Sequence, residues 1–305
     1  MTAPGALAAR APAKVNVHLG VGPLREDGFH ELRTVYLAVS LFDTVTVGPG
    51  DGLTLALSGE GAAVVPADRS NLVWRAAELL AEHAGVPADA SIEVAKSIPV
   101  AGGLAGGSAD AAATLVALDA FWGTRAGHED LMALAARLGS DVPFGLVGGV
   151  ALGTGRGEQV APVLSGGTGH WVLGIAGEGL STPAVYGELD RLRAQGRVAA
   201  PTAPASAERV IEALRSGSPA AVGAALANDL QAPALSLRPG LRRALRVAEE
   251  AGAVAALVSG SGPTVAALAA DGPAAVRLAA ELAGTGVFRT VRAVSGPVPG
   301  ARLLP

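Results

Sequence analysis

Four glycines within six positions point more directly to chemistry than any other feature of this sequence. They precede an alanine-rich segment that predicts a helix beginning at Ser108. Glycines leave backbone N–H groups accessible, and the unpaired N–H groups of a helix N-terminus add about half a positive charge. This combination is typical of a phosphate-binding loop. The alternative is a tight turn, although a turn needs one or two glycines rather than four. The glycines are Gly102, Gly103, Gly106 and Gly107.

The loop departs from the two common nucleotide-binding patterns. Residues 102–107 have the outer glycine spacing of a Walker A loop, but Ser108 and Ala109 stand where that motif requires Lys and Ser or Thr. The dinucleotide-binding pattern G-x-G-x-x-G also fails, because Leu104 occupies the position of its second glycine. The loop alone therefore predicts phosphate binding without choosing among the classes of nucleotide-binding protein.

The two lysines are the next candidates, because the chain has only two of them against 21 arginines. Lys14 lies in segment 11–19, and Lys96 lies just before the glycine-rich loop. In a chain so biased toward arginine, a lysine indicates that a compact charge is wanted at that place. The alternative is chance placement on a strand edge, and the lysines alone do not decide between the two.

Asp141 is a candidate carboxylate in segment 138–144, with Pro143 two residues further on. An aspartate in this setting is typical of the N-cap of a short helix. A catalytic carboxylate is the other interpretation, and the bare motif favours the cap.

A second glycine-containing loop, Ser-Gly-Ser-Gly-Pro-Thr at 259–264, lies in the middle of an uncharged segment, 251–270. The segment is long enough to span a bilayer, but the loop would break a helix there. We expect two short strands flanking a tight turn. The turn equally provides a set of backbone donors for an anion.

The composition excludes several classes of function. A net charge of -4 and a pI near 5.8 argue against a general nucleic-acid or anionic-membrane binder. The absence of cysteine excludes disulfides, thiolate catalysis and cysteine-ligated metals. The five histidines show no metal-ligand spacing. No secretory-signal layout is present in the first residues, so we expect a soluble, cytoplasmic protein that acts on a small molecule, with no nucleic-acid or membrane partner.

The elements that must position these residues alternate between strands and helices. The pattern restarts near residue 171, which predicts two units, 1–160 and 161–305, the second of them α+β. A Pro/Ala-rich stretch, 198–206, is expected to be a mobile loop. Strands are expected at 53–57, 91–94 and 171–175, and helices at 72–83, 108–122, 129–138 and about 207–216, 219–227 and 239–251.

Taken in order, these segments resemble the motifs of the galactokinase, homoserine kinase, mevalonate kinase and phosphomevalonate kinase (GHMP) superfamily. The segments that carry the resemblance are 11–19, 98–113 and 259–264. Adding 27–32 (Asp-Gly-Phe-His-Glu-Leu) and 139–144 (Gly-Ser-Asp-Val-Pro-Phe) makes the chain similar to the branch that phosphorylates a cytidine diphosphate-linked methylerythritol. The resemblance covers about 11–293. It implies an α+β, two-domain GHMP-kinase-like fold with the active site in the cleft between the domains.

The resemblance also implies an ATP-dependent kinase of non-mevalonate isoprenoid biosynthesis, with Mg²⁺ accompanying ATP. The γ-phosphoryl group would go to the 2-hydroxyl of the methylerythritol moiety, with Asp141 as the catalytic base and Lys14 as its partner. A carboxylate can take the hydroxyl proton, and an ammonium stabilises developing negative charge. The implied ATP-binding residues are Pro99, Val100, Ala101, Gly102, Gly103, Leu104, Ala105, Gly106, Gly107, Ser108 and Ala109.

For the cytidine, the resemblance implies aromatic stacking and a histidine. Phe29 and His30 match these positions, and Tyr186 is a candidate for the second wall, with core packing as the alternative. Stacking on a base contributes about 1–3 kcal/mol per contact. Asn16, close to Lys14, is a candidate for a hydrogen bond to the substrate.

Two departures from the family pattern bear on these expectations. The family loop usually reads Gly-Leu-Gly-Gly-Gly-Ser-Ser, whereas this chain has alanine at 105 and 109. Ala109 removes a hydroxyl that could touch a phosphate or Mg²⁺, so the metal ligands stay open. Phe29 replaces the commoner tyrosine, which keeps the stacking face and loses a hydroxyl.

Two alternatives remain open at this point. One is a sibling kinase acting on homoserine or mevalonate, which has no need of segment 27–30. The other is a nucleotide-binding protein without catalysis, which has no need of both Lys14 and Asp141. The sequence also leaves open the adenine pocket, the extent of domain closure, and whether the protein is a monomer or a homodimer.

Overall fold

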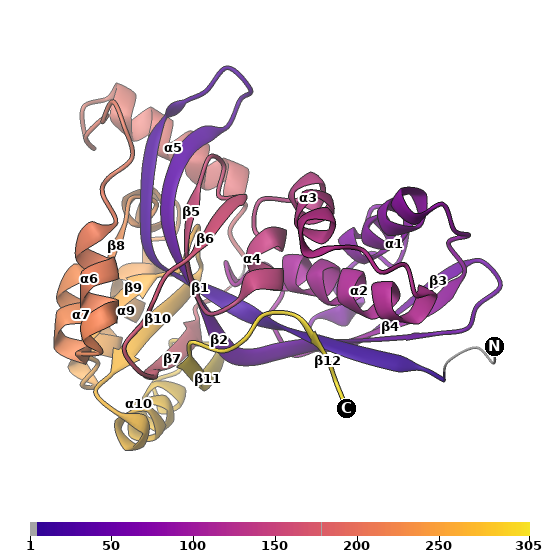
Figure 1. The fold of residues 1–305 in the computed structure, drawn as a ribbon. Coiled ribbons are helices and arrows are strands. Elements are labelled where there is room, and N and C mark those ends of the chain that lie inside the picture. Colours follow the sequence, from indigo (N-terminus) through magenta and orange to yellow (C-terminus); the bar gives the residue numbers. More distant parts are fainter. Residues whose placement is uncertain (1–4, 178) are drawn as a thin grey trace.

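Two β-sheets organise the chain in the computed structural model, which describes residues 5–177 and 179–305 (Figure 1). The main path of the first sheet has the order β12-β1-β2-β4-β3, and β5, β6 and β8 pair at its sides. Its strands are β1 (Leu7–Leu24), β2 (His30–Gly48), β3 (Leu53–Gly59), β4 (Ala90–Lys96), β5 (Val150–Thr154), β6 (Gln159–Pro162), β8 (Ala227–Asn228) and β12 (Arg302–Leu303).

The hairpin of β1 and β2 is the longest feature of this sheet. Its strands have 18 and 19 residues and pair antiparallel along most of their length. The middle of β1 is buried on both faces, so it lacks the alternation of a half-exposed strand and is filled with small and β-branched residues. Three register shifts interrupt the pairing, and such bulges bend a strand and redirect its side chains. The hairpin thereby reaches from one part of the molecule into the other (Figure 1).

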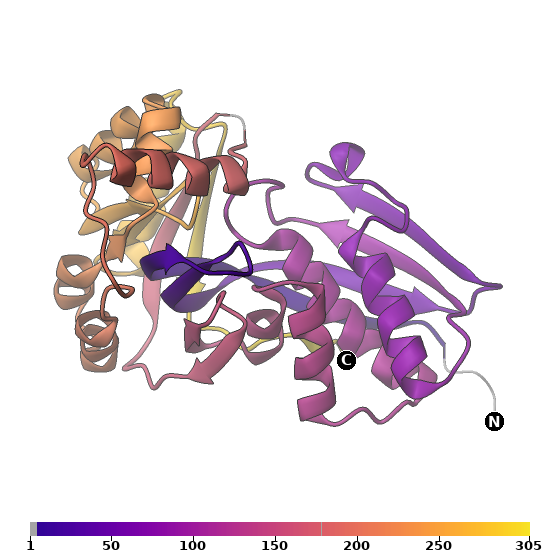
Figure 2. The same cartoon turned by 90° about the horizontal axis from the view of Figure 1, so that it is seen from above.

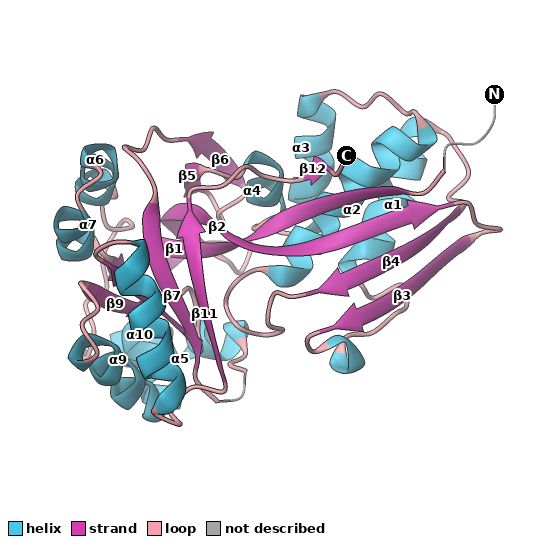
Figure 3. Cartoon of the chain, turned by 90° about the horizontal axis from the view of Figure 1, so that it is seen from below, coloured by secondary structure: helices cyan, strands magenta, loops and turns pink. Residues whose placement is uncertain are grey.

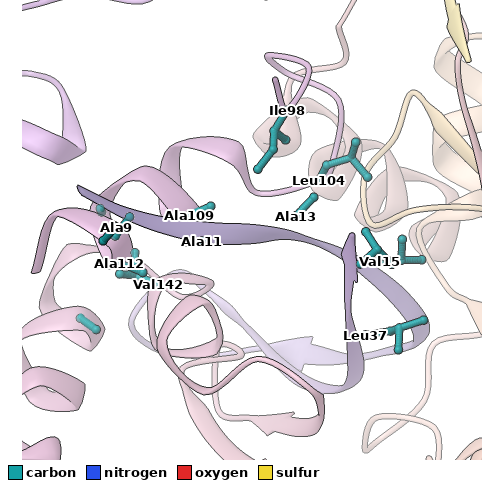
Figure 4. Packing of buried hydrophobic residues seen from close by; sticks show 14 of the residues in the cluster. Ala9, Ala11, Ala13, Val15, Leu37, Ile98, Leu104, Ala109, Ala112 and Val142 are labelled. Atoms are coloured by element: carbon teal, nitrogen blue, oxygen red, sulfur yellow. The ribbon is translucent and has the colours of Figure 1, made fainter. Parts of the chain in front are cut away.

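Helices α1 (Leu72–Ala84), α2 (Gly106–Trp122) and α3 (His128–Leu138) lie on one face of the first sheet (Figure 3). The α2 helix is alanine-rich and therefore packs closely against β1. Figure 4 labels Ala109 and Ala112 of this helix in the same buried cluster as Ala11 of β1 and Val142. Val142 begins α4 (Val142–Val147), and a 3₁₀ helix spans Ala62–Val64.

The second sheet is antiparallel, with the order β11-β7-β10-β9. Helix α5 contacts the far end of the long hairpin, because Arg193 donates hydrogen bonds to the carbonyl oxygens of Val21 and Gly22 (Figure 2). The strands are β7 (Gly169–Ile175), β9 (Ala255–Val258), β10 (Thr264–Ala269) and β11 (Thr290–Gly296). The helices are α5 (Thr182–Ala194), α6 (Glu208–Ser216), α7 (Pro219–Ala225), α8 (Gln231–Leu237), α9 (Gly240–Glu250) and α10 (Gly272–Gly284).

The predicted elements are confirmed with small shifts at their ends. The uncharged segment 251–270 contains β9, the tight turn and β10, as expected, and residues 198–206 lie outside helices and strands. Helix α2 begins at Gly106 rather than Ser108, so two of the four loop glycines form its first turn. Helix α7 ends at Ala225, and β8 follows it. The α+β fold class is also confirmed. None of the helices in the described ranges is long and apolar enough to cross a membrane.

The segment 297–304 returns to the first sheet from the second. Its strand β12 pairs with β1, with Leu303 opposite Ala9. Just before β12, Ala301 donates a backbone hydrogen bond of 2.8 Å to the carbonyl oxygen of Gly145, in α4. We call residues 297–304 the C-terminal strap. The strap therefore joins β1 to α4.

Candidate active site

A cleft of about 880 Å³ brings together segments that are far apart in the sequence. Its lining comes from β1, the start of β2, the glycine-rich loop, the residues before α4, and the α5 helix with the 259–264 turn. Among the predicted site residues, those that line it are Lys14, Asn16, Phe29, His30, Pro99, Val100, Ala101, Gly102, Gly103, Ala105, Gly106, Gly107, Ser108, Asp141 and Tyr186.

The glycine-rich loop is fixed against the second sheet. Gly103 has a φ of 75°, and a Cβ at this position would lie 2.5 Å from the carbonyl oxygen of Ser259. Only glycine fits such a conformation and such a close approach. The backbone N–H of Thr264 donates to the carbonyl oxygen of Gly102 at 3.3 Å. The two glycine-containing loops recognised in the sequence therefore form one wall of the cleft.

The first turn of α2 presents unpaired backbone donors to this cleft. Within the described ranges, the N–H groups of Gly106, Gly107 and Ser108 donate no backbone or side-chain hydrogen bond. All three residues line the cleft. Orphan N–H groups at a helix N-terminus attract anions. The arrangement therefore suits a phosphate group, as predicted.

Leu104 and Ala109 lie behind the loop rather than in its wall. Their exposed fractions are 1% and 2%, and both belong to the core cluster (Figure 4). The N–H of Ala109 already donates to the carbonyl oxygen of Ala105 at 2.9 Å. The side chain of residue 109 thus points into the core. The alanine at this position therefore removes no hydroxyl from the cleft wall.

Lys14 lies at the base of the loop and is almost fully buried. Its ammonium donates to the Oδ1 atom of Asn16 at 2.5 Å and to the carbonyl oxygen of Gly103 at 3.1 Å. Asn16 in turn donates to the Thr34 hydroxyl at 2.8 Å. The amide of Asn16 therefore positions Lys14 in this structure.

Asp141 faces Lys14 across the cleft. Its Oδ2 atom lies 3.7 Å from the Lys14 ammonium, and its side chain is 30% exposed. The residue occupies the N-cap position of α4, yet its side chain makes no capping hydrogen bond. The cap interpretation that the bare motif favoured therefore does not account for the carboxylate, which is directed into the cleft.

Tyr36 is a residue of this site that the sequence did not reveal. Its hydroxyl donates a hydrogen bond of 3.0 Å to the Oδ1 atom of Asp141, and its ring stacks on Phe144 with the centroids 4.8 Å apart. Burial, followed by the nearby Asp141 carboxylate, raises the pKa of Tyr36 well above its usual value. The hydroxyl thus keeps its proton and acts as a donor to Asp141.

Lys96 has a structural environment, although it reaches the cleft wall. Its ammonium lies between Asp43 and Asp110, at 2.5 Å from an oxygen of each. Asp43 also accepts the backbone N–H groups of Ser97 and Ile98. Burial opposes the charge, but the carboxylates of Asp110 and Asp43 raise the pKa of Lys96 overall. This buried cluster anchors the chain where it enters the glycine-rich loop.

The aromatic residues line another part of the cleft. Phe29 is 48% exposed, whereas His30 is buried and lies 2.9 Å from the Oδ1 atom of Asp190. Tyr186 is partly buried and stacks on His30, with the ring centroids 5.2 Å apart. Burial raises the pKa of Tyr186, with a further contribution from Asp141. An exposed ring in the same cleft as a stacked pair suits a planar base.

Such a cleft, with a helix N-terminus, a lysine–aspartate pair and an aromatic wall, is typical of a small-molecule kinase. The chain belongs to the GHMP kinase family: the model for the GHMP kinases N terminal domain matches residues 71–149, and the model for GHMP kinases C terminal matches residues 210–287.

Individual relatives within this family show which kinases the chain is similar to. The chain is 58% identical to 4-diphosphocytidyl-2-C-methyl-D-erythritol kinase from Rhodococcus jostii (strain RHA1), over 99% of this chain and 96% of the relative. It is also 58% identical to the kinase of the same name from Mycolicibacterium smegmatis, over 99% and 93%. A crystal structure of 4-(cytidine 5'-diphospho)-2C-methyl-D-erythritol kinase has a TM-score of 0.76 at 35% identity and covers 94% of this chain and 98% of that one. The resemblance found in the motifs is confirmed.

Proposed function

We propose that this chain transfers the γ-phosphoryl group of ATP to the 2-hydroxyl of 4-diphosphocytidyl-2-C-methyl-D-erythritol, giving the 2-phosphate and ADP in non-mevalonate isoprenoid biosynthesis. The observation that carries the proposal is the Lys14–Asp141 pair, which lies between the free N–H groups of α2 and the Phe29–His30 wall in one cleft. The names of the relatives support the choice of substrate.

Asp141 is the proposed catalytic base. Its partly exposed carboxylate takes the proton of the 2-hydroxyl as that oxygen bonds to the γ-phosphorus, and the bond from phosphorus to the bridging oxygen of ADP breaks. Lys14 stabilises the negative charge that develops on the transferred group. Asn16 and Tyr36 orient these two side chains, and phosphoryl transfer depends strongly on positioning.

The glycine-rich loop is the proposed ATP-binding element, from Pro99 to Ala109. Its backbone donors at Gly106, Gly107 and Ser108 suit the phosphates, while Leu104 and Ala109 support the loop from the core. Phe29, His30 and Tyr186 form the proposed cytidine-binding wall.

Mg²⁺ belongs to the proposal as the partner of ATP. Within residues 5–177 and 179–305, no group of three or more acidic or histidine side chains is arranged to hold a metal ion. Mg²⁺ keeps several waters and binds through one or two carboxylates together with substrate phosphates, so a sparse donor set fits it. Asp141 and Ser108 line the cleft and would supply oxygen ligands to the ion. The ion would neutralise phosphate charge.

The remaining expectations stay predictions from the sequence. They are a division into units 1–160 and 161–305, a cytoplasmic location, and a monomer or homodimer. The division is supported by the second sheet, whose strands all follow residue 160.

A coupled assay of ADP release tests the function. We expect turnover with 4-diphosphocytidyl-2-C-methyl-D-erythritol and inhibition of that turnover by CDP. With homoserine or mevalonate as the acceptor we expect no ADP release. Turnover with one of those alcohols instead would favour a sibling kinase. Binding of ATP without turnover of any of the three would favour a nucleotide-binding protein without catalysis.

A further inference from the structure

The proposed substrate carries a diphosphate between its cytidine and its methylerythritol, and this group needs a cationic partner. Three Lys or Arg side chains line the described part of the cleft. Lys96 is held between Asp43 and Asp110, and Lys14 faces Asp141. Arg156 is the third. Arg156 belongs to none of the motifs that carry the family resemblance, and the proposed mechanism gives it no role.

Arg156 lies in the turn that connects β5 to β6, and contacts hold this turn at both ends. At one end, the backbone N–H of Leu32 donates to the carbonyl oxygen of Gly155 at 2.8 Å. Leu32 is close in sequence to Phe29 and His30. The Tyr36 hydroxyl, which donates to Asp141, lies 3.4 Å from the carbonyl oxygen of Gly157. The turn that carries Arg156 is therefore held beside Leu32 at one end and beside Tyr36, the partner of Asp141, at the other.

The guanidinium of Arg156 is oriented but has donors to spare. Its central carbon lies 4.8 Å from the centroid of the Phe29 ring, in a cation–π contact. Its Nε atom lies 4.0 Å from the nearest Glu158 oxygen, beyond hydrogen-bond distance. Glu158 instead accepts the backbone N–H of Arg156 at 2.6 Å. Within the described residues, the guanidinium donates no side-chain hydrogen bond, and 31% of the side chain is exposed.

We propose that the Arg156 guanidinium binds the diphosphate of the substrate, so that the cleft holds a diphosphate subsite between Phe29 and Asp141. The inference rests on the proposed function. The fork of an arginine matches phosphate oxygens in a bidentate manner, which a lysine cannot reproduce. The contact with Phe29 holds the fork beside the ring on which the base is expected to stack. One turn thus aligns both the nucleoside and the charged linker.

The test compares ligands that differ only in phosphate, using the whole protein. Calorimetry measures the Kd of cytidine, CMP and CDP for wild type, Arg156→Gln and Arg156→Lys, and the ADP-release assay gives kcat and KM. For Arg156→Gln we expect the Kd of CDP and the KM of the cytidine substrate to rise between about 10-fold and 100-fold. The Kd of cytidine, the KM of ATP and kcat should change by less than about 3-fold. The Kd of CDP for Arg156→Lys should lie between the values for wild type and Arg156→Gln.

Arg25→Gln is the matched control, because it removes the same charge near Phe29 from a guanidinium already paired with Asp27 and Glu31. It should leave the Kd of CDP unchanged. An equal loss of cytidine and CDP binding in Arg156→Gln would mean that Arg156 only supports the Phe29 ring, and would overturn the subsite. An equal effect of Arg25→Gln would overturn it as well. A wild type that binds neither ligand and shows no turnover would refute the proposed function and the subsite together. Normal wild-type turnover with an unaffected Arg156→Gln would refute only the subsite.

Discussion

The Tyr36 hydroxyl donates a hydrogen bond of 3.0 Å to one oxygen of Asp141. The other oxygen of this carboxylate faces the Lys14 ammonium at 3.7 Å. Tyr36 is 2% exposed and its ring is stacked, so its hydroxyl has little freedom. The carboxylate is thereby held in one orientation while 30% of the side chain remains open to the cleft. A general base needs both properties, because it must reach its proton in a fixed geometry.

Replacing Asp141 tests its assignment as base against its role as a helix cap. For Asp141→Asn and Asp141→Ala we expect kcat to fall about 10²-fold to 10⁴-fold. Thermal unfolding of Asp141→Asn should stay close to that of wild type, because the side chain makes no capping hydrogen bond and the Asn oxygen can still accept the hydrogen bond of Tyr36. In Asp141→Ala the buried Tyr36 hydroxyl loses this acceptor, which costs about 1–3 kcal/mol of stability. A variant that keeps wild-type turnover would refute the base assignment.

Tyr36→Phe removes one hydrogen bond and little else. We expect kcat to fall about 10-fold, the typical effect of losing a hydrogen bond to a charged group. The KM of ATP should remain within about 2-fold, and the fold should be retained because the stack on Phe144 survives. Steady-state kinetics and near-UV circular dichroism are the measurements. An unchanged kcat would show that Tyr36 does not position the carboxylate.

Ala105 is held in a left-handed conformation, with a φ of 57°, immediately before α2. This conformation costs a residue with a Cβ atom about 1 kcal/mol, and glycine adopts it freely. Ala105→Gly should therefore raise the free energy of unfolding by up to about 1 kcal/mol, measured by urea denaturation. Ala133→Gly, at an exposed position of α3 with ordinary helical geometry, is the control and should lower it by about 1 kcal/mol. An equal decrease in the free energy of unfolding in both variants would contradict backbone strain at Ala105.

Asp110 gives the stability of the protein a specific pH dependence. Burial, followed by the Asp43 carboxylate, raises the pKa of Asp110 to about 8 against the attraction of Lys96. The folded protein thus keeps this proton up to about pH 8, while the unfolded chain loses it near pH 4. Between these values the unfolded state binds fewer protons, so this carboxyl group makes stability fall as the pH rises.

Asp110→Asn lacks this titration. Its free energy of unfolding relative to wild type should increase from about pH 4 to about pH 8, by at most about 1.4 kcal/mol per pH unit, and level off above. Urea denaturation of both proteins at four pH values across this window is the measurement. A constant difference between the two curves would exclude a raised pKa for Asp110.

The local motifs of this chain made part of the site predictable. The glycine-rich loop, Lys14 and Asp141 each lie in a short segment whose residue types indicate their chemistry, and the structure brings them together in one cleft. Tyr36 was not predictable, because it lies 105 residues from Asp141 and looks like an ordinary apolar strand residue. For Lys96 the sequence left a site role and chance placement equally open, and the sheet places Asp43, 53 residues away, beside it.

The fold shows the same division between local and long-range signals. Helices such as α1 and α3 were predicted from their apolar spacing and terminal glycines. The β1–β2 hairpin was not, because β1 is buried on both faces and therefore shows no alternating pattern. The sequence left Tyr186 open between a wall of the cytidine site and core packing. The structure shows its ring stacked on His30 in the cleft lining.

The C-terminal strap limits how this enzyme can be recombined. It belongs to the second unit in sequence, yet its β12 strand pairs with the strand that carries Lys14, and its Ala301 contacts the helix that follows Asp141. At Gly300 a Cβ would lie 2.2 Å from the carbonyl oxygen of Leu146, so a donor chain must also supply glycine there. A chimera joined at residue 160 would therefore combine the Lys14–Asp141 pair of one parent with the C-terminal strap of the other. The two proposed units are therefore not interchangeable as modules.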